Sequence, residues 1–448
     1  MAKTPSFFGN KATPSRLAIL CLGVLILNLV TSCAVRNVVR QARLAESIGE
    51  IGGRVAVGTG MTGNVHVIAF QPGPTDLDFT IVSDLIADRD GSFRIPVEPG
   101  GYFIGTFQDV NGDGAHQREA EPAAYFNSDG LRPTLFTVPR SGHLKLEPLA
   151  LTGLFNGVPV VRTVDGAPAV TKNIGRVVSL DDAMFSAANS TMGLWRPVDF
   201  LKQVGGGLFM LQEYRADLTP VIFIHGISGS PTDFAPLIQV LDQTRFQPWV
   251  LHYPSGLRLD LVSDYLDRAL NMLRTRYGFA SICVVAHSMG GLVARSFVMK
   301  HEARGHAEPV VLMMTINSPM LGMKSAAIGV QFAPVVIPAW RDVALNSEFV
   351  QGLRAWRWPP QIPYHLVFSY QAGSGSDGVV PLESQIPIGL QDESVRIYGF
   401  QATHAGVLKK PTFLRHFGAA MAATPPTATA ASHPPRAGGS PAAAGSRP

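Results

Sequence analysis

Between residues 216 and 422 the chain alternates short apolar runs with longer segments of helical pattern. The runs are rich in Val, Ile, Leu, Met and Phe: PVIFIHG, FQPWVLHYPSG, ASICVVAHSMGG, PVVLMMTINSP, YHLVFSY and VRIYGFQATHAG. Apolar strands separated by helices predict a parallel sheet that is covered on both faces. Active sites in such sheets form at the carboxyl ends of the strands, so the polar motifs at those ends indicate the candidate site.

Residues 51–152 have a different pattern, in which short alternating runs are broken by Gly, Pro and Asp. Runs of this kind predict a small antiparallel β-sandwich. Segment 34–50 is expected to form a short helix or a tether, and segment 153–215 to lead into the next domain as its first strands. The tail 423–448 is rich in Pro, Ala and Gly without periodicity and is expected to be disordered.

The first 33 residues have the pattern of a secretion leader. Basic residues precede an apolar stretch at 17–30, which is short for a membrane span and fits a signal peptide. The VTSC motif that ends at Cys33 resembles the lipobox of bacterial lipoproteins. The resemblance implies that Cys33 carries a diacylglyceryl anchor, and Ala34 after it implies the outer membrane of a Gram-negative cell envelope. An ordinary signal peptide with a chance Cys, or an uncleaved anchor, is the alternative.

Charge and cysteine content narrow the function classes. The formal net charge of +4 includes Lys3, Lys11 and Arg16 in a leader without acidic residues, so the remaining chain is close to neutral. This balance argues against a nucleic-acid groove or a polybasic membrane patch. The placement of the cysteines allows neither a disulfide framework nor a Cys-rich zinc site.

The most specific motif is AHSMGG, which follows the apolar run ICVV and precedes the helical segment LVARSFVMK. It resembles the nucleophile elbow of the α/β-hydrolase family, G-x-S-x-G, with Ala286 in place of the first Gly. Small residues on both sides of Ser288 let the strand and the helix approach closely while the serine adopts a strained backbone. The resemblance implies that Ser288 is the nucleophile and that the domain is an α/β hydrolase with a doubly wound, mostly parallel sheet.

A second apolar run, PVIFI, ends in His225-Gly226. The family resemblance places one oxyanion-hole amide on the next residue, Ile227, and the other on the residue after the nucleophile, Met289. Two preset N–H donors aimed at a developing oxyanion stabilise it strongly. A turn is the alternative role for Gly226 and Gly229.

The acid and the base are expected to follow in the order Ser, Asp, His. Asp377, in SDGVVP, comes after the run HLVFSY and matches the stretch that carries the acid in this family. Glu383 and Asp392 are rival acids, and a surface turn is the alternative role for Asp377. His404 follows the last strand, where the family places its base, whereas His287 beside the nucleophile is usually structural in this family.

These assignments imply acyl transfer through an acyl-enzyme, without a catalytic cofactor. The apolar insert at about 321–360, which contains Trp340, Trp356 and Trp358, occupies the position where many lipases carry a lid or an acyl-chain wall; ordinary helix packing is the alternative. The resemblance implies a lipase or esterase, the glycosyl-phosphatidylinositol-deacylase-like group included, that takes an acyl ester or lipid substrate. A phospholipase, an acyltransferase or a surface binding protein with a degenerate hydrolase core is the alternative.

Within residues 51–152, the motif DVNGDG places oxygen ligands at Asp109, Asn111 and Asp113, a spacing that suits Ca²⁺. The segment resembles the calcium loops of carboxypeptidase-regulatory-like sandwiches, in which a Glu-Pro closes the loop. Here Glu121 precedes the proline one residue later than in that family, and an EF-hand would need a Glu where Ala120 stands. The resemblance implies a structural calcium site, and a metal-free turn is the alternative.

Overall fold

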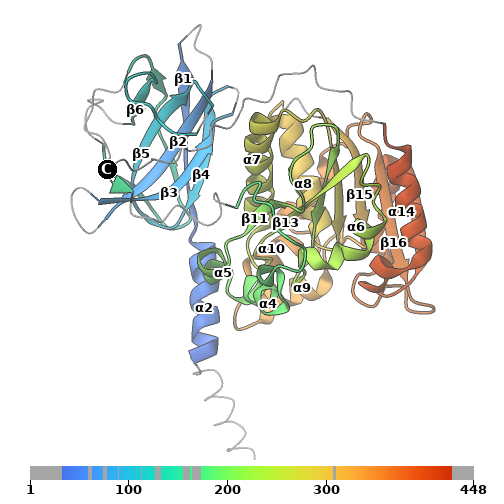
Figure 1. The fold of residues 1–448 in the computed structure, drawn as a ribbon. Coiled ribbons are helices and arrows are strands. Elements are labelled where there is room, and N and C mark those ends of the chain that lie inside the picture. The colour runs from blue at the N-terminus through green and yellow to red at the C-terminus, as the bar shows by residue number, and fades with distance from the viewer. Residues whose placement is uncertain are drawn as a thin grey trace, which may run out of the picture.

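The computed structural model describes residues 33–58, 63–73, 78–88, 90–112, 114–126, 133–154, 162–163, 173–305 and 309–425. The predicted signal peptide and nearly all of the predicted disordered tail lie outside these residues. An all-β domain and an α/β domain lie side by side (Figure 1). The segment expected to form a short helix or a tether begins with helix α2 (Cys33–Glu46), which packs against α5 (Pro197–Gln203) of the α/β domain.

The all-β domain contains two sheets, and most of its strand pairs are antiparallel. The first sheet has the order β4-β1-β8, with β9 also paired to β1, and the second has the order β10-β3-β2-β5-β6, with β7 paired to β5. The strands are β1 (Gly49–Val57), β2 (Asn64–Pro72), β3 (Asp78–Ile86), β4 (Ser92–Val97), β5 (Gly100–Asp109), β6 (Ala123–Tyr125), β7 (Phe136–Val138), β8 (His143–Lys145), β9 (Leu149–Leu151) and β10 (Arg162–Thr163). The predicted all-β domain is therefore confirmed.

Strand β4 shows how the alternating pattern builds this domain. Phe93, Ile95 and Val97 are buried in a shared hydrophobic core, whereas Arg94 points to the other face and is exposed. Side chains alternate across a strand with a period of two, so one face of the strand enters the core.

The α/β domain is built on a seven-stranded sheet with the order β11-β13-β12-β14-β15-β16-β17. The pair of β11 and β13 is antiparallel, and all other neighbouring pairs are parallel. The strands are β11 (Gly207–Met210), β12 (Thr219–Ile224), β13 (Phe246–His252), β14 (Ile282–His287), β15 (Val310–Ile316), β16 (Tyr364–Tyr370) and β17 (Arg396–Gln401). This confirms the predicted doubly wound, mostly parallel sheet, whose first strand, β11, comes from the expected lead-in segment.

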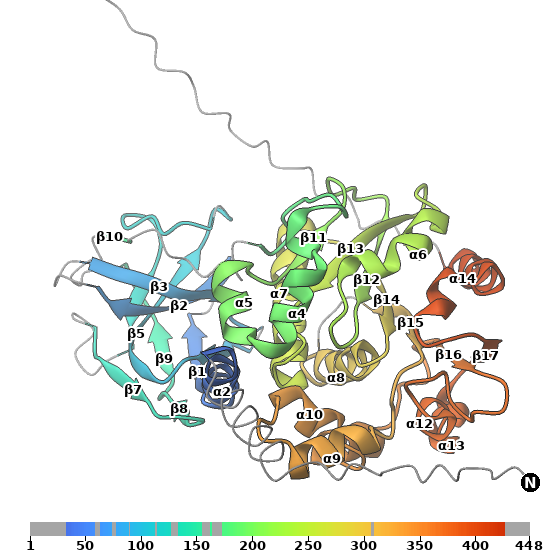
Figure 2. The same cartoon turned by 90° about the horizontal axis from the view of Figure 1, so that it is seen from below.

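Both faces of the central strands are buried, each in its own core. In β12, Ile222 and Ile224 enter one hydrophobic cluster, whereas Val221 and Phe223 enter the other. The first cluster includes buried side chains of α7 (Leu259–Tyr277) and α8 (Gly290–Ala303). The second includes buried side chains of α6 (Ala235–Val240) and α14 (Pro411–Ala423). Figure 2 shows these two helix layers on opposite faces of the sheet. Burial on both faces explains why these strands are apolar without alternation.

The remaining helices lie in loops that follow the strands or lead into the sheet. They are η1 (Ala183–Phe185), α4 (Ala187–Trp195), η2 (Pro231–Phe234), α9 (Lys324–Phe332), α10 (Pro338–Val343), α11 (Glu348–Ala355), α12 (Leu382–Gln385), α13 (Ile388–Glu393) and η3 (Gly406–Lys409). Helices α9, α10 and α11 make up most of the predicted insert. In the described part of the chain no helix is both long and apolar enough to cross a membrane.

Candidate active site

Ser288 lies in the turn between β14 and α8, as the AHSMGG motif predicts. Its φ of 55° is in the left-handed region, which residues with a side chain rarely adopt. The turn is tight because α8 begins directly against β12: a Cβ added to Gly290 would lie 2.3 Å from the carbonyl oxygen of Ile224. Such strain is typical of a nucleophile elbow, in which the serine hydroxyl is held at the end of the sheet.

The loops after three different strands bring Ser288, His404 and Asp377 together. Nε2 of His404 lies 2.9 Å from Oγ of Ser288, and Nδ1 of His404 lies 2.6 Å from Oδ2 of Asp377. An ionised carboxylate can only accept hydrogen bonds, so Nδ1 carries the proton and Nε2 is free to accept the Ser288 hydroxyl proton. The three side chains therefore form one continuous line of hydrogen bonds in the tautomer that base catalysis needs.

The carboxylate of Asp377 is fixed by its own loop. It is 1% exposed, and Oδ1 accepts hydrogen bonds from the backbone amides of Val379 at 2.8 Å and Val380 at 2.7 Å. The rival acids Glu383 and Asp392 lie on the surface, and both are exposed. Of these three carboxylates, Asp377 is the one that the structure brings to His404.

The His-Gly turn after β12 lies directly beside the nucleophile. A Cβ on Gly226 would lie 2.7 Å from Cβ of Ser288. Within the described residues, neither the amide of Ile227 nor that of Met289 donates a hydrogen bond to another part of the chain. Neither predicted oxyanion donor is therefore occupied by a hydrogen bond within the described residues.

Tyr253 and burial hold this turn in place. The hydroxyl of Tyr253 donates to the carbonyl oxygen of His225 at 2.7 Å, and the two rings stack 4.3 Å apart. Burial lowers the pKa of His225 to about 4, so the imidazole is neutral at pH 7 and lies 2.9 Å from the carbonyl oxygen of Gly226 through Nδ1. His225 is thus a neutral side chain that supports the His-Gly turn through its packing and its contact with Gly226.

Two supporting residues hold the backbone of His404. Nε2 of His287 lies 3.0 Å from the carbonyl oxygen of His404, and Nδ2 of Asn317 donates to the same oxygen at 2.9 Å. Burial, and to a smaller extent the nearby His404, lowers the pKa of His287 to about 3. A histidine that stays neutral at pH 7 fits the structural role expected for His287. Asn317 was not predicted from the sequence, although it lies just after β15, at a strand end like the other site residues.

The insert combines ordinary packing with exposed apolar side chains. Trp358 is 6% exposed, and both Trp356 and Trp358 lie against the guanidinium of Arg295, so packing accounts for these two tryptophans. In contrast, Ile328 and Phe332, four residues apart on α9, are 50% and 71% exposed.

The predicted calcium loop is only partly described, because Asp113 lies outside the described residues. Asp109 accepts hydrogen bonds from the amides of Gly112 and Gly114, and Glu121 accepts from the amides of Val110 and Gln117. Both carboxylates therefore organise the loop backbone, and a cation would have to share their remaining lone pairs. Among the described residues, no group of three or more His, Cys, Asp or Glu side chains is placed to hold a metal. Calcium binding stays a prediction.

Several solved structures are similar to parts of the chain. Bacillus licheniformis lipase BlEst2 is 15% identical, with 47% of this chain and 94% of that chain covered and a TM-score of 0.38. Aspergillus fumigatus lipase B is 18% identical, with 50% and 57% covered and a TM-score of 0.37. The Listeria innocua lin2722 product is 16% identical, with 45% and 92% covered and a TM-score of 0.35.

No curated protein matches the chain. Residues 219–342 match the family described as alpha/beta hydrolase fold. This segment runs from the start of β12 to α10 and contains the His-Gly turn and the strained turn at Ser288. With the seven-stranded sheet order, the match establishes that the chain carries an α/β-hydrolase fold behind an all-β domain.

Proposed function

We propose that this protein is a serine hydrolase of carboxylic acyl esters, of the lipase or esterase type. The observation that carries the proposal is the line of hydrogen bonds from Asp377 through His404 to Ser288. The two available amides of Ile227 and Met289 support it, since ester hydrolysis needs donors for an oxyanion. The chemistry needs no cofactor.

In the proposed mechanism, Nε2 of His404 takes the proton from Ser288 as Oγ attacks the ester carbonyl carbon. The bond to the alcohol oxygen then breaks, His404 returns the proton to that oxygen, and the acyl group stays on Ser288. Water, deprotonated by His404, attacks the acyl-enzyme and releases the carboxylic acid. Asp377 accepts a hydrogen bond from Nδ1 throughout and stabilises the imidazolium. Each oxyanion donor contributes about 3 kcal/mol to stabilisation of the transition state.

We further propose that the protein acts at a lipid surface to which it is anchored. Exposed Ile328 and Phe332 on α9 favour an apolar or lipid substrate. The lipobox-like motif supports a diacylglyceryl anchor on Cys33, directly at the start of α2, and Ala34 favours the outer membrane. Replacing Cys33 with Ser should move the protein out of the membrane fraction. Continued attachment of the variant would show that the leader itself is the anchor.

Labelling with a fluorophosphonate tests the nucleophile. The parent protein should be labelled, and Ser288→Ala should lose both the label and hydrolysis of nitrophenyl esters, with kcat reduced by a factor on the order of 10⁶. Ser179→Ala is the matched control, because Ser179 is exposed and lies before the sheet. Residual activity of Ser288→Ala within tenfold of the parent would refute the assignment. A series of ester chain lengths would then separate an esterase from a lipase.

A further inference from the structure

A cleft between the two domains contains an apolar cavity of about 680 Å³. Its walls include Ile81 and Val82 of β3 on one side and Leu257, Leu261 and Met272 on the other. Neither Ser288, His404 nor Asp377 lines it. Its volume is in the range of small-molecule sites, which are mostly apolar with few polar groups.

A second cavity of about 900 Å³ adjoins the first and is charged. Leu85 and Arg268 line both cavities, so these two residues mark the boundary between them. Six lysines and arginines and four Asp and Glu residues line the charged cavity, and Asp90, Glu50 and Asp267 outside its lining pair with Arg54, Arg94 and Arg304. Among the described residues, Lys145 and Arg268 are the two lining cations that form no ion pair. An apolar cavity that meets a charged cavity at Arg268, a cation without an ion pair in the described chain, matches the chemistry of an amphiphile with a negative head.

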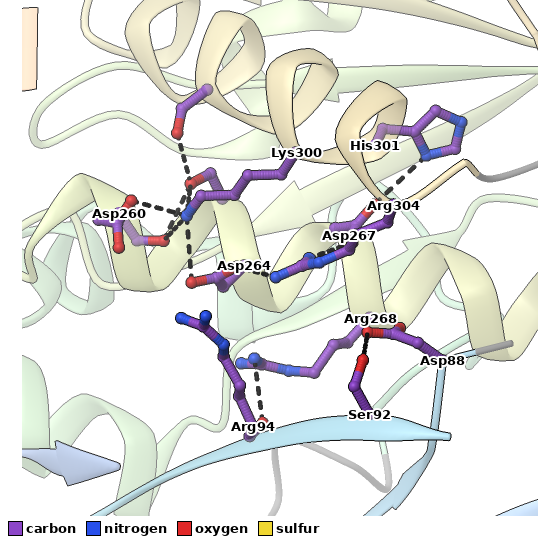
Figure 3. A network of polar contacts seen from close by, with 12 residues as sticks. Asp88, Ser92, Arg94, Asp260, Asp264, Asp267, Arg268, Lys300, His301 and Arg304 are labelled. Carbon is purple, nitrogen blue, oxygen red and sulfur yellow. Dashed lines mark hydrogen bonds and ion pairs between the residues drawn. The ribbon is translucent and has the colours of Figure 1, made fainter. Parts of the chain in front are cut away.

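Arg268 lies at the junction of the two halves. Figure 3 shows it reaching from α7 to Arg94 on β4, where its guanidinium donates to the carbonyl oxygen of Arg94 at 3.3 Å. In the part of the chain that the structure describes, this guanidinium forms no ion pair within 4.0 Å. Burial lowers the pKa of Arg268, although nearby acidic residues act in the opposite direction. A partly buried guanidinium that faces a cavity is a strong site for a carboxylate or phosphate.

Three carboxylates act on Arg268 from nearby, those of Asp264, Glu50 and Asp267, and each also pairs with another cation. Glu50 lies 3.8 Å from Arg94. Asp264, one turn earlier on α7, pairs with Arg304 at 2.7 Å and with Lys300 at 3.1 Å. Asp267 is also paired with Arg304 (Figure 3).

The acidic residues of the apolar cavity have partners as well. Glu98 pairs with Lys202 at 2.8 Å, and Asp84 lies 2.9 Å from His66. Arg268 therefore has acidic neighbours but, within the described residues, no ion pair of its own, so its guanidinium can pair with the head of a bound anion.

We propose that this interdomain cleft binds a single-chain amphiphile with an anionic head. The aliphatic tail fills the apolar cavity, and the carboxylate or phosphate head meets Arg268 at the border of the charged cavity, with Arg94 and Lys145 in the same wall. The ligand contacts both domains and therefore stabilises their arrangement. This binding site is separate from Ser288 and does not depend on the proposed ester hydrolysis.

Photo-crosslinking with a diazirine-bearing hexadecanoic acid on the purified full chain tests the site. The label should map to peptides of β3 and α7, and the same peptides should be labelled in Ser288→Ala. Octadecanoate and octadecyl phosphate should compete, octadecanol should compete about tenfold less well because it lacks the charge-assisted hydrogen bonds, and inorganic phosphate should not compete. Label confined to the Ser288 region, or equal competition by octadecanol, would overturn the proposal. Full competition by inorganic phosphate would also overturn it, because the site would then be a simple anion site.

Variants on α7 separate the two halves of the site. Arg268→Gln should weaken labelling by the acid about tenfold and leave competition by octadecanol unchanged. Arg276→Gln, an exposed arginine near the end of the same helix, is the matched control and should change neither. Met272→Trp fills the apolar cavity and should weaken both ligands. If Arg268→Gln and Met272→Trp, each with an unchanged melting temperature, both label like the parent, the proposal is wrong.

Discussion

Buried histidines lie in opposite electrostatic environments in the two domains. In the all-β domain, burial alone would lower the pKa of His66, but its hydrogen bond to Asp84 and the charges of Asp84, Asp109 and Glu121 outweigh burial and raise it. In the α/β domain, burial lowers the pKa of His252 to about 3. Burial by itself therefore does not decide whether an imidazole is charged; the carboxylates around it do.

The difference shows how each domain uses its polar residues. The all-β domain gathers carboxylates around one loop, where they hold backbone amides and His66. The α/β domain keeps His225 and His287 neutral in the walls of its site and gives His404 a carboxylate partner, Asp377. A carboxylate–histidine pair thus has a structural role in one domain and the proposed catalytic role in the other.

Breaking one carboxylate–histidine pair in each domain should give the largest difference in kcat between two variants. Asp377→Asn should reduce kcat about 10⁴-fold, because the amide favours the wrong tautomer of His404. Asp84→Asn removes the partner of His66 and should leave kcat unchanged, and so should Glu383→Gln on the surface. Steady-state kinetics with a nitrophenyl ester provide the measurement. Equal losses in Asp377→Asn and Glu383→Gln would contradict the assignment of the acid.

The depressed pKa of His252 should appear as loss of stability in acid. The unfolded chain takes up this proton as pH falls below 6.5, whereas the folded protein does not until about pH 3. Stability from this group is therefore complete above pH 6.5 and falls by about 3 kcal/mol by about pH 4. Unfolding measured against pH should show a shallower acid decline in His252→Gln than in His416→Gln, whose histidine is exposed. If the free energy of unfolding falls equally steeply with pH in both variants, His252 is not the source of the acid sensitivity.

Calcium should give the smallest effect, confined to the carboxylate-rich loop of the all-β domain. If the loop binds Ca²⁺, a concentration ten times Kd stabilises the folded protein by about 1.4 kcal/mol. The melting temperature of the full chain should rise with Ca²⁺ and fall again with a chelator, and Asp109→Asn should abolish the change. Melting curves that are identical with Ca²⁺ and with chelator would leave Asp109 and Glu121 as backbone-holding residues alone.

The sequence predicted the strands and the candidate triad because both depend on local patterns. The apolar runs form strands buried on both faces, and Ser288, Asp377 and His404 each follow a strand, so one sheet edge gathers them. Asn317 was not predicted, and the structural role expected for His287 came without a partner, because both act on a backbone oxygen of His404 that reaches them only after the loops assemble.

Contacts between distant segments explain what the local patterns could not predict. Trp358 lies against Arg295 of α8, so its burial depends on a residue far away in the chain. Arg268 has the pattern of an ordinary helical arginine, and its surroundings become apparent only when the all-β domain packs against α7. Packing between domains produces no periodic pattern of apolar and polar residues in either segment, so the sequence does not reveal it.

The most direct test of the central claim is to trap the acyl-enzyme. The protein is mixed with a nitrophenyl ester, quenched in acid during turnover, digested and analysed by mass spectrometry. We expect an added acyl group on the peptide that contains Ser288, accumulating in the parent and absent in Ser288→Ala. Ester turnover with no acyl group on that peptide, or with an acyl group on another residue, would contradict it.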